Sequence, residues 1–295
     1  MKCARFCVIL FGVVLVLPVF VAARTSRSGF FTTSDGVRLH YLEAGSGPAL
    51  VFVPGWTMPA DIWETQLTQF SRSYHVVALD PRSQGESDKP ADGNYPERRA
   101  QDIKELVDHL KLAPAVLVGW SMGVPELLTY VEQFGTSSVR GLVLVDGLIW
   151  DQPNPQMAAA VTSWMHDFQR NRQKSTETFV RSMFKKPQAE DYLRRITKAS
   201  LKTPTNSAVL LIRNVDRESW TPVLTSLAQA RTPVLGIFTT QAKGAADLLR
   251  TTIPDARVEI FEDAGHAMFV DDPAQFNGVL ESFLKSIAVA PPSTP

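Results

Sequence analysis

The sequence has almost no cysteine, and this scarcity narrows the chemistry open to it. Only two of the 295 residues are cysteines, Cys3 and Cys7, and both lie within an N-terminal segment that we expect to be removed. The rest of the chain has none. A disulfide framework, a thiol nucleophile and a cysteine-bound metal are therefore excluded for the mature protein.

The sequence also lacks a net charge. Its 30 lysines and arginines balance 30 aspartates and glutamates, with no basic stripe and no acidic tail. This pattern gives no reason to expect nucleic acid as a partner. No glycine-rich phosphate loop follows the first buried strand, and no histidines or carboxylates have metal-ligand spacing. We therefore expect neither a nucleotide cofactor nor a metal.

Residues 1–23 differ in kind from the rest of the chain. Basic residues precede an apolar run over 7–23, which ends in small side chains. This pattern is typical of a secretory signal peptide cleaved after Ala23. The alternative is an uncleaved membrane anchor, although the run is short for a full span and contains Pro18. We expect a secreted or periplasmic protein with no stable membrane insertion after cleavage.

Beyond this segment, short apolar runs alternate with amphipathic stretches. A hairpin is expected over 30–47, with Asp35 and Gly36 in its turn. Buried strands are expected over 48–56, 115–118, 139–147, 232–238 and 256–261, and within 74–88, where a loop with proline and glycine breaks the strand. Helices are expected over 60–70, 96–110, 244–252 and 273–287. Such alternation predicts an α/β fold with a mostly parallel sheet and helices on both faces.

The alternation stops between residues 150 and 226. That stretch contains helical patterns such as PQMAAAVTSWMHDFQR and no convincing pair of strands. We therefore expect 150–226 to form a helical cap inserted into a single α/β core, whose two parts are 24–149 and 227–289. The tail over 290–295 has the composition of a disordered segment.

A serine between two glycines stands where one of the expected strands gives way to a helix. In the segment GWSMG, Gly119 and Gly123 leave room for a sharp turn around Ser121, because neither carries a Cβ. The N-terminus of a helix favours developing negative charge. The pattern Gly-x-Ser-x-Gly occurs by chance in unrelated chains, but the strand–turn–helix context is that of a nucleophile elbow. Ser121 is therefore the candidate nucleophile.

A serine hydroxyl attacks a carbonyl only with help from a base and from donors to the oxyanion. His266 is the candidate base, because it lies in the loop DAGHAMF after the last expected strand, at the same edge of the sheet as Ser121. The expected oxyanion donors are backbone N–H groups. One belongs to Met122, which follows the nucleophile, and one to Trp56 in the loop after the strand over 48–56.

Large apolar side chains near the elbow and in the cap are candidates for the wall of a substrate pocket. They are Met58, Trp120, Trp150, Met157 and Trp164, together with the side chains of Trp56 and Met122. A wall of this kind favours an uncharged substrate.

These features resemble those of the α/β-hydrolase superfamily, in the group that includes small-molecule esterases and cofactor-free perhydrolases. The resembling segments are VFVPGWTMPADIW, VVALDPRSQGESDKP, LVGWSMGVPELL, GLVLVDG and DAGHAMFVDDPAQFNGVLESFL. The resemblance implies an eight-stranded α/β-hydrolase fold and a Ser-His-Asp carboxylic ester hydrolase. Such an enzyme would cleave small, largely uncharged esters through an acyl-enzyme without a cofactor.

Two other functions remain open on the same scaffold. One is a perhydrolase, haloperoxidase or lyase that uses the same three residues, which fold-level analogy does not separate from an esterase. The other is a ligand-binding member of the fold that has lost catalysis. Relatives with an aspartate nucleophile are disfavoured, because position 121 is serine.

The sequence departs from the pattern of the family in two loops. Pro54 stands where relatives usually have histidine before the oxyanion-loop glycine, and this leaves the Trp56 N–H unaffected. In the segment RSQG, Gln84 stands where histidine is common, and the residue pattern indicates no function for it.

The third departure concerns the acid. Relatives usually carry it after the penultimate strand, but here TTQAKGAAD has no carboxylate before Asp247, which is expected on the surface of a helix. Asp255 lies in a turn, and Asp263 is on the approach to His266. Asp146 ends the segment GLVLVD, where some members of the family place their acid. We therefore predict that Asp146 orients His266.

The N-terminal segment supports a direct test of export. We expect the mature protein to begin at Arg24, and N-terminal sequencing of protein from the native host would identify that residue. An intact Met1 in a membrane fraction would instead support the anchor.

Overall fold

A computed structural model describes residues 26–147, 149–213 and 217–289 of the chain. The expected signal peptide over 1–23 and the expected disordered tail over 290–295 lie outside these ranges. Within them, no helix is long and apolar enough to cross a membrane.

Eight strands in the described ranges form one sheet, in the order β1-β2-β4-β3-β5-β6-β7-β8. They are β1 (Arg27–Thr32), β2 (Arg38–Gly45), β3 (Ala49–Val53), β4 (His75–Leu79), β5 (Ala115–Trp120), β6 (Val139–Val145), β7 (Val234–Thr239) and β8 (Arg257–Phe261). The β1–β2 and β2–β4 pairs are antiparallel, and every other pair is parallel. The predicted eight-stranded, mostly parallel sheet is confirmed.

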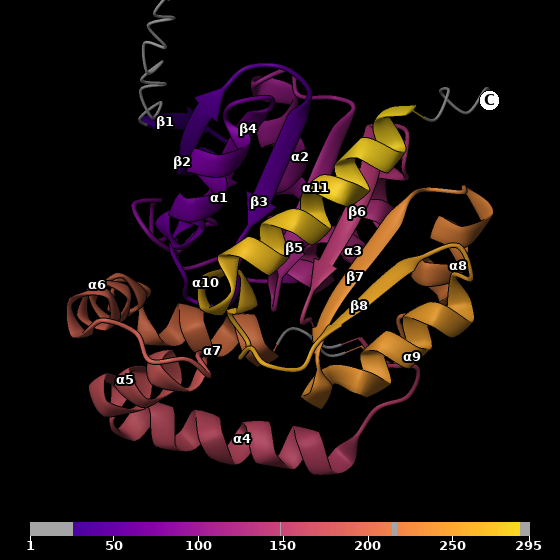
Figure 1. Cartoon of the computed structure of the whole chain (residues 1–295). Coiled ribbons are helices and arrows are strands. Elements are labelled where there is room, and N and C mark those ends of the chain that lie inside the picture. The colour runs from indigo at the N-terminus through magenta and orange to yellow at the C-terminus, as the bar shows by residue number, and fades with distance from the viewer. Residues whose placement is uncertain (1–25, 148, 214–216, 290–295) are drawn as a thin grey trace, which may run out of the picture.

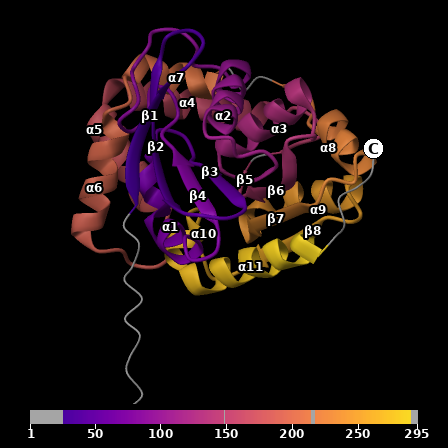
Figure 2. The same ribbon diagram turned by 90° about the horizontal axis from the view of Figure 1, so that it is seen from above.

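Helices cover both faces of this sheet (Figure 2). One face carries α2 (Pro96–His109), α3 (Gly123–Phe134), α8 (Thr221–Gln229) and α9 (Lys243–Thr252), and the other carries α1 (Glu64–Phe70) and α11 (Pro273–Val289). Three shorter helices are η1 (Ala60–Trp63), η2 (Thr240–Ala242) and α10 (Met268–Asp271). The central strands are buried on both sides, as their continuous apolar runs require.

Four helices between β6 and β7 lie beyond one end of the sheet (Figure 1). They are α4 (Pro155–Arg170), α5 (Arg172–Ser182), α6 (Glu190–Leu201) and α7 (Thr205–Arg213). The range 150–226 that we assign to the cap also includes the start of α8, which packs against α3 and α9 in the layer on the sheet. The extent of the cap as a unit remains a prediction.

The register of the parallel strands determines which residues reach the cap. Trp120 pairs with Val145 across β5 and β6, and Val145 pairs in turn with Ile237 of β7. Three neighbouring strands therefore end at nearly the same level. The residues that follow them lie side by side under the four helices.

Candidate active site

The turn at Ser121 has the tight geometry expected of a nucleophile elbow. Ser121 has a φ of 55°, in the left-handed region that residues other than glycine rarely occupy. A Cβ at Gly119 would lie 2.5 Å from the carbonyl oxygen of Gly123, and a Cβ at Gly123 would lie 2.5 Å from that of Val53. Both glycines are therefore required by the packing of α3 against β5 and β3.

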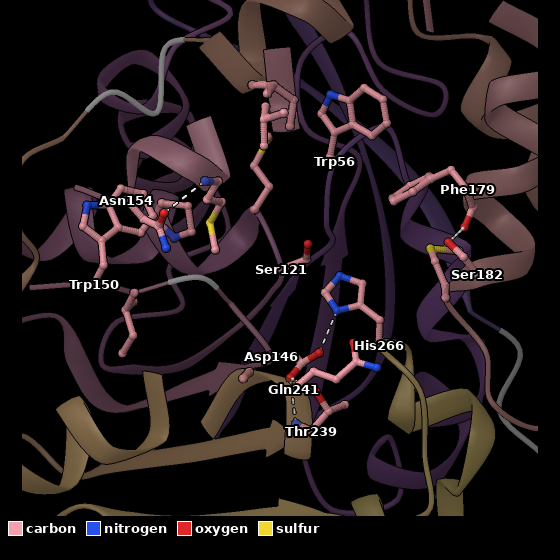
Figure 3. Close-up of a pocket in the computed structure, with 18 of the residues that line it drawn as sticks. Trp56, Ser121, Asp146, Trp150, Asn154, Phe179, Ser182, Thr239, Gln241 and His266 are labelled. Atoms are coloured by element: carbon pink, nitrogen blue, oxygen red, sulfur yellow. Dashed lines mark hydrogen bonds and ion pairs between the residues drawn. The ribbon is translucent and has the colours of Figure 1, made fainter. Parts of the chain in front are cut away.

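Asp146 and His266 are in direct contact. Oδ2 of Asp146 accepts a hydrogen bond of 2.8 Å from Nδ1 of His266, and Asp146 is buried. Because a carboxylate only accepts, this bond places the proton of a neutral imidazole on Nδ1 and leaves Nε2 as an acceptor. Figure 3 shows the His266 ring between Asp146 and Ser121.

Both Ser121 and His266 belong to the described residues, and no hydrogen bond joins their side chains. In enzymes without bound substrate such bonds are often long or poorly aligned, and they tighten in the Michaelis complex. The arrangement is therefore compatible with Nε2 acting as a base toward the Ser121 hydroxyl.

Thr239 completes the surroundings of the Asp146 carboxylate. Its backbone N–H and its hydroxyl both donate to Oδ1, at 2.7 and 2.9 Å. Asp146 therefore accepts three hydrogen bonds, which fix the position of its carboxylate. Thr239 ends β7, close to where relatives usually carry their acid. The sequence showed that the usual carboxylate is missing there, but it did not show that Thr239 would donate to Asp146 instead.

The other carboxylates considered for this role lie away from His266. Asp247 is exposed on α9 and pairs with Arg250, as the helical interpretation of 244–252 predicts. Asp255 is exposed, and Asp263 pairs with Lys185 at 3.0 Å.

The oxyanion loop is held against both the elbow and the cap. A Cβ at Gly55 would lie 2.9 Å from Cβ of Ser121, so the loop backbone passes directly beside the candidate nucleophile. The indole N–H of Trp56 donates to the Ala208 carbonyl of α7 at 2.8 Å. Within the described part of the chain, no hydrogen bond uses the backbone N–H of Trp56 or Met122.

The pair Asp271–Asp272 has two separate roles. Asp272 accepts from the backbone N–H of Gln275 at 3.1 Å and so caps the first turn of α11. Asp271 instead accepts from the backbone N–H groups of Gly265 and Lys185, each at 2.7 Å. This carboxylate therefore ties the loop that carries His266 to the segment after α5, a contact that sequence spacing did not indicate.

A cavity of about 1420 Å³ lies between the candidate catalytic residues and the cap helices. Ser121, Asp146 and His266 line it together with Trp56 and Met122. Its wider apolar wall consists of Ile149, Trp150, Met157, Val161, Met165, Phe179, Met183, Phe184, Val209 and Ile212. Lys185 and Arg217 also line it, and each is paired with a carboxylate, Asp263 and Glu132 respectively.

The structure places only part of the predicted pocket wall at the cavity. Trp150 and Met157 line it as expected. Met58 and Trp120 do not, because both are buried in the core on the α1 and α11 side of the sheet. Trp164 lies behind the wall, with its ring 5.0 Å from that of Trp56.

Comparison with known proteins agrees with this geometry. The family model described as "alpha/beta hydrolase fold" matches residues 48–273, and the chain therefore belongs to that family. A non-heme chloroperoxidase, CPO-A1 of Kitasatospora aureofaciens, is 29% identical over 281 residues, covering 86% of this chain and 98% of the relative. An esterase from Exiguobacterium antarcticum, EaEST, has a TM-score of 0.80 at 25% identity, covering 87% of this chain and 98% of its own.

Other curated relatives match over a shorter region. The bifunctional esterase/perhydrolase DCH of Acinetobacter calcoaceticus is 33% identical over 123 residues, which is 41% of this chain and 45% of the relative. Two further haloperoxidases are matched over less than half of their length.

Proposed function

We propose that this protein is an exported serine hydrolase that cleaves small, largely uncharged carboxylic esters through an acyl-enzyme. The observation that carries the proposal is the contact of Asp146 with Nδ1 of His266, at the edge of the sheet where Ser121 lines the same cavity. The names of the esterase and esterase/perhydrolase relatives support the same class of reaction.

In the proposed mechanism, Oγ of Ser121 attacks the ester carbonyl and Nε2 of His266 takes the hydroxyl proton. Asp146 holds the ring and stabilises the imidazolium. The oxyanion is bound by the backbone N–H groups of Trp56 and Met122. Collapse of the tetrahedral intermediate expels the alcohol, which takes the proton from His266. Water, activated by His266, then attacks the acyl-enzyme and releases the acid.

The surroundings of Ser121 support an uncharged substrate. Large apolar side chains form much of the wall. Among the charged residues of the lining, Lys185 and Arg217 are paired with carboxylates, and Arg213 and Glu262 carry opposite charges. Ligand pockets typically measure about 300–1,000 Å³. The cavity is therefore large enough for both the acyl and the alcohol parts of a small ester.

Replacing the nucleophile tests the proposal directly. Ser121→Ala should abolish turnover of p-nitrophenyl butyrate and labelling by a fluorophosphonate probe, because the alanine has no oxygen to acylate. Ser182→Ala is a matched control, since Ser182 lines the same cavity but its hydroxyl donates to the Phe179 carbonyl of its own helix. Retained labelling in Ser121→Ala, mapped by mass spectrometry, would refute the assignment.

The acid has a matched test of its own. Asp146→Asn should lower kcat by about 10⁴-fold while circular dichroism and Tm show an intact fold, by analogy with the serine-protease aspartate. An amide that accepts from Thr239 would present its NH₂ group to Nδ1 and so favour the wrong tautomer. Asp247→Asn should leave kcat unchanged, because Asp247 is exposed on α9. The reverse result would overturn the role of Asp146.

A perhydrolase or haloperoxidase remains the second candidate, and the similarity to chloroperoxidase CPO-A1 favours it specifically. In that reaction, hydrogen peroxide replaces water in the attack on the acyl-enzyme and a peracid leaves. Rates of peracid formation and of ester hydrolysis, measured on one ester with and without peroxide, separate the two. Faster peracid formation would identify a perhydrolase. The intact contact between Asp146 and His266 argues against a member of the fold that only binds ligands.

A further inference from the structure

Gln84 lies behind the oxyanion loop in the loop between β4 and α2, and it is completely buried. Its side-chain Nε2 donates to the carbonyl oxygens of Gly55 and Met58, at 3.0 and 2.8 Å. These two carbonyls flank Trp56 and Thr57. One amide group therefore holds both ends of the turn that carries an expected oxyanion donor.

The Gly55 carbonyl accepts from Gln84 and also from the Met58 backbone N–H, at 3.1 Å, and its direction sets where the Trp56 N–H points. The C=O of Gly55 and the N–H of Trp56 belong to one planar, trans peptide unit, in which the two groups point in opposite directions. Because the carbonyl faces Gln84, the N–H faces away from Gln84. The same loop backbone lies directly beside Ser121.

Arg99 determines which way the Gln84 amide is turned. Nη1 of Arg99 donates to Oε1 of Gln84 at 2.9 Å. A guanidinium group has no acceptor, so the amide oxygen must face Arg99 and the NH₂ group must face the loop. With the opposite orientation, the amide would present an oxygen to two carbonyls.

A buried ion pair links Arg99 to the helix that follows the nucleophile. Nε of Arg99 lies 2.9 Å from Oε1 of Glu126, in the first turn of α3, and both side chains are buried. Burial raises the pKa of Glu126, and the nearby Arg99 opposes that shift. The chain of contacts from Gly55 to Glu126 therefore connects the loop of Trp56 with the helix that begins after Met122.

We propose that Gln84 is a positioning residue for the oxyanion hole: it aims the Trp56 N–H by holding the Gly55 carbonyl, and Arg99 fixes its amide. This inference rests on the proposed function. It assigns a role to the position where the sequence departs from the histidine common among relatives. A buried glutamine that served stability alone would not act selectively on the transition state.

Gln84→Met tests this role, because it keeps the length of the side chain and removes both donors. Loss of one oxyanion donor costs roughly 10²–10³ in kcat, and a misdirected donor should cost about 10–100-fold. We expect that loss in kcat for p-nitrophenyl butyrate, with KM near that of the wild type. Binding of a trifluoromethyl ketone, whose hemiketal oxyanion mimics the transition state, should weaken in parallel.

Gln66→Met is the matched control. Gln66 is equally buried, and its Nε2 donates to the Phe269 carbonyl and to Oδ1 of Asn277, both at 3.1 Å, away from the oxyanion loop. Loss of a buried amide should lower Tm in both variants. Only Gln84→Met should lower kcat and weaken binding of the ketone. Equal kcat values in the two variants would overturn the inference.

A milder variant covers the case in which Gln84→Met fails to fold. Gln84→Asn keeps the amide but is one methylene too short to reach both carbonyls, and it should still lower kcat selectively. A folded Gln84→Asn variant with the kcat of the wild type would overturn this inference and leave the proposed function standing. A wild-type protein with neither ester turnover nor fluorophosphonate labelling would overturn the proposed function and this inference together.

Discussion

The parallel pairing of β5, β6 and β7 is the constraint on which the candidate site depends. The ladder continues beyond the strands themselves. The backbone N–H of Ser121 donates to the Val145 carbonyl at 2.9 Å, and the backbone N–H of Asp146 donates to the Ile237 carbonyl at 2.8 Å. Both donating residues have positive φ angles, 55° and 44°. Such conformations cost of order 1–3 kcal/mol each and persist where surrounding contacts hold them. Here the backbone ladder supplies those contacts.

Polar side chains beneath the site compensate for two departures from the family pattern. Where a carboxylate is usual after β7, Thr239 donates twice to the carboxylate on the neighbouring strand. Where histidine is common, Gln84 bridges two carbonyls of the oxyanion loop. Buried polar groups of this kind are stabilising only when they are paired, so each departure is accompanied by matching partners. The site is therefore supported by contacts specific to this chain.

The cap reaches the site through a few directed contacts as well as apolar packing. The Trp56 indole donates to α7, and the hydroxyls of Thr57 and Ser200 share a hydrogen bond of 2.7 Å. On the other side of the cavity, Asp271 joins the loop of His266 to the segment after α5. Both the oxyanion loop and the histidine loop therefore depend on the cap for their position, although the cap is remote from them in sequence.

The sequence alone was sufficient to predict the order of strands and helices, the elbow at Ser121 and the approach of Asp146 to His266. The strands, the helices and the elbow follow from local periodicity, and their shared edge follows from the rule for the carboxyl ends of parallel strands. The choice of Asp146 also rested on the resemblance to family members that place their acid after this strand. Tertiary structure alone decided that Thr239 supports Asp146, that Gln84 holds the oxyanion loop, and which apolar residues face the cavity. Apolar character predicts burial but does not distinguish a core from a pocket wall. Partners of buried polar groups come from segments far apart in the chain, so only the folded arrangement can specify them.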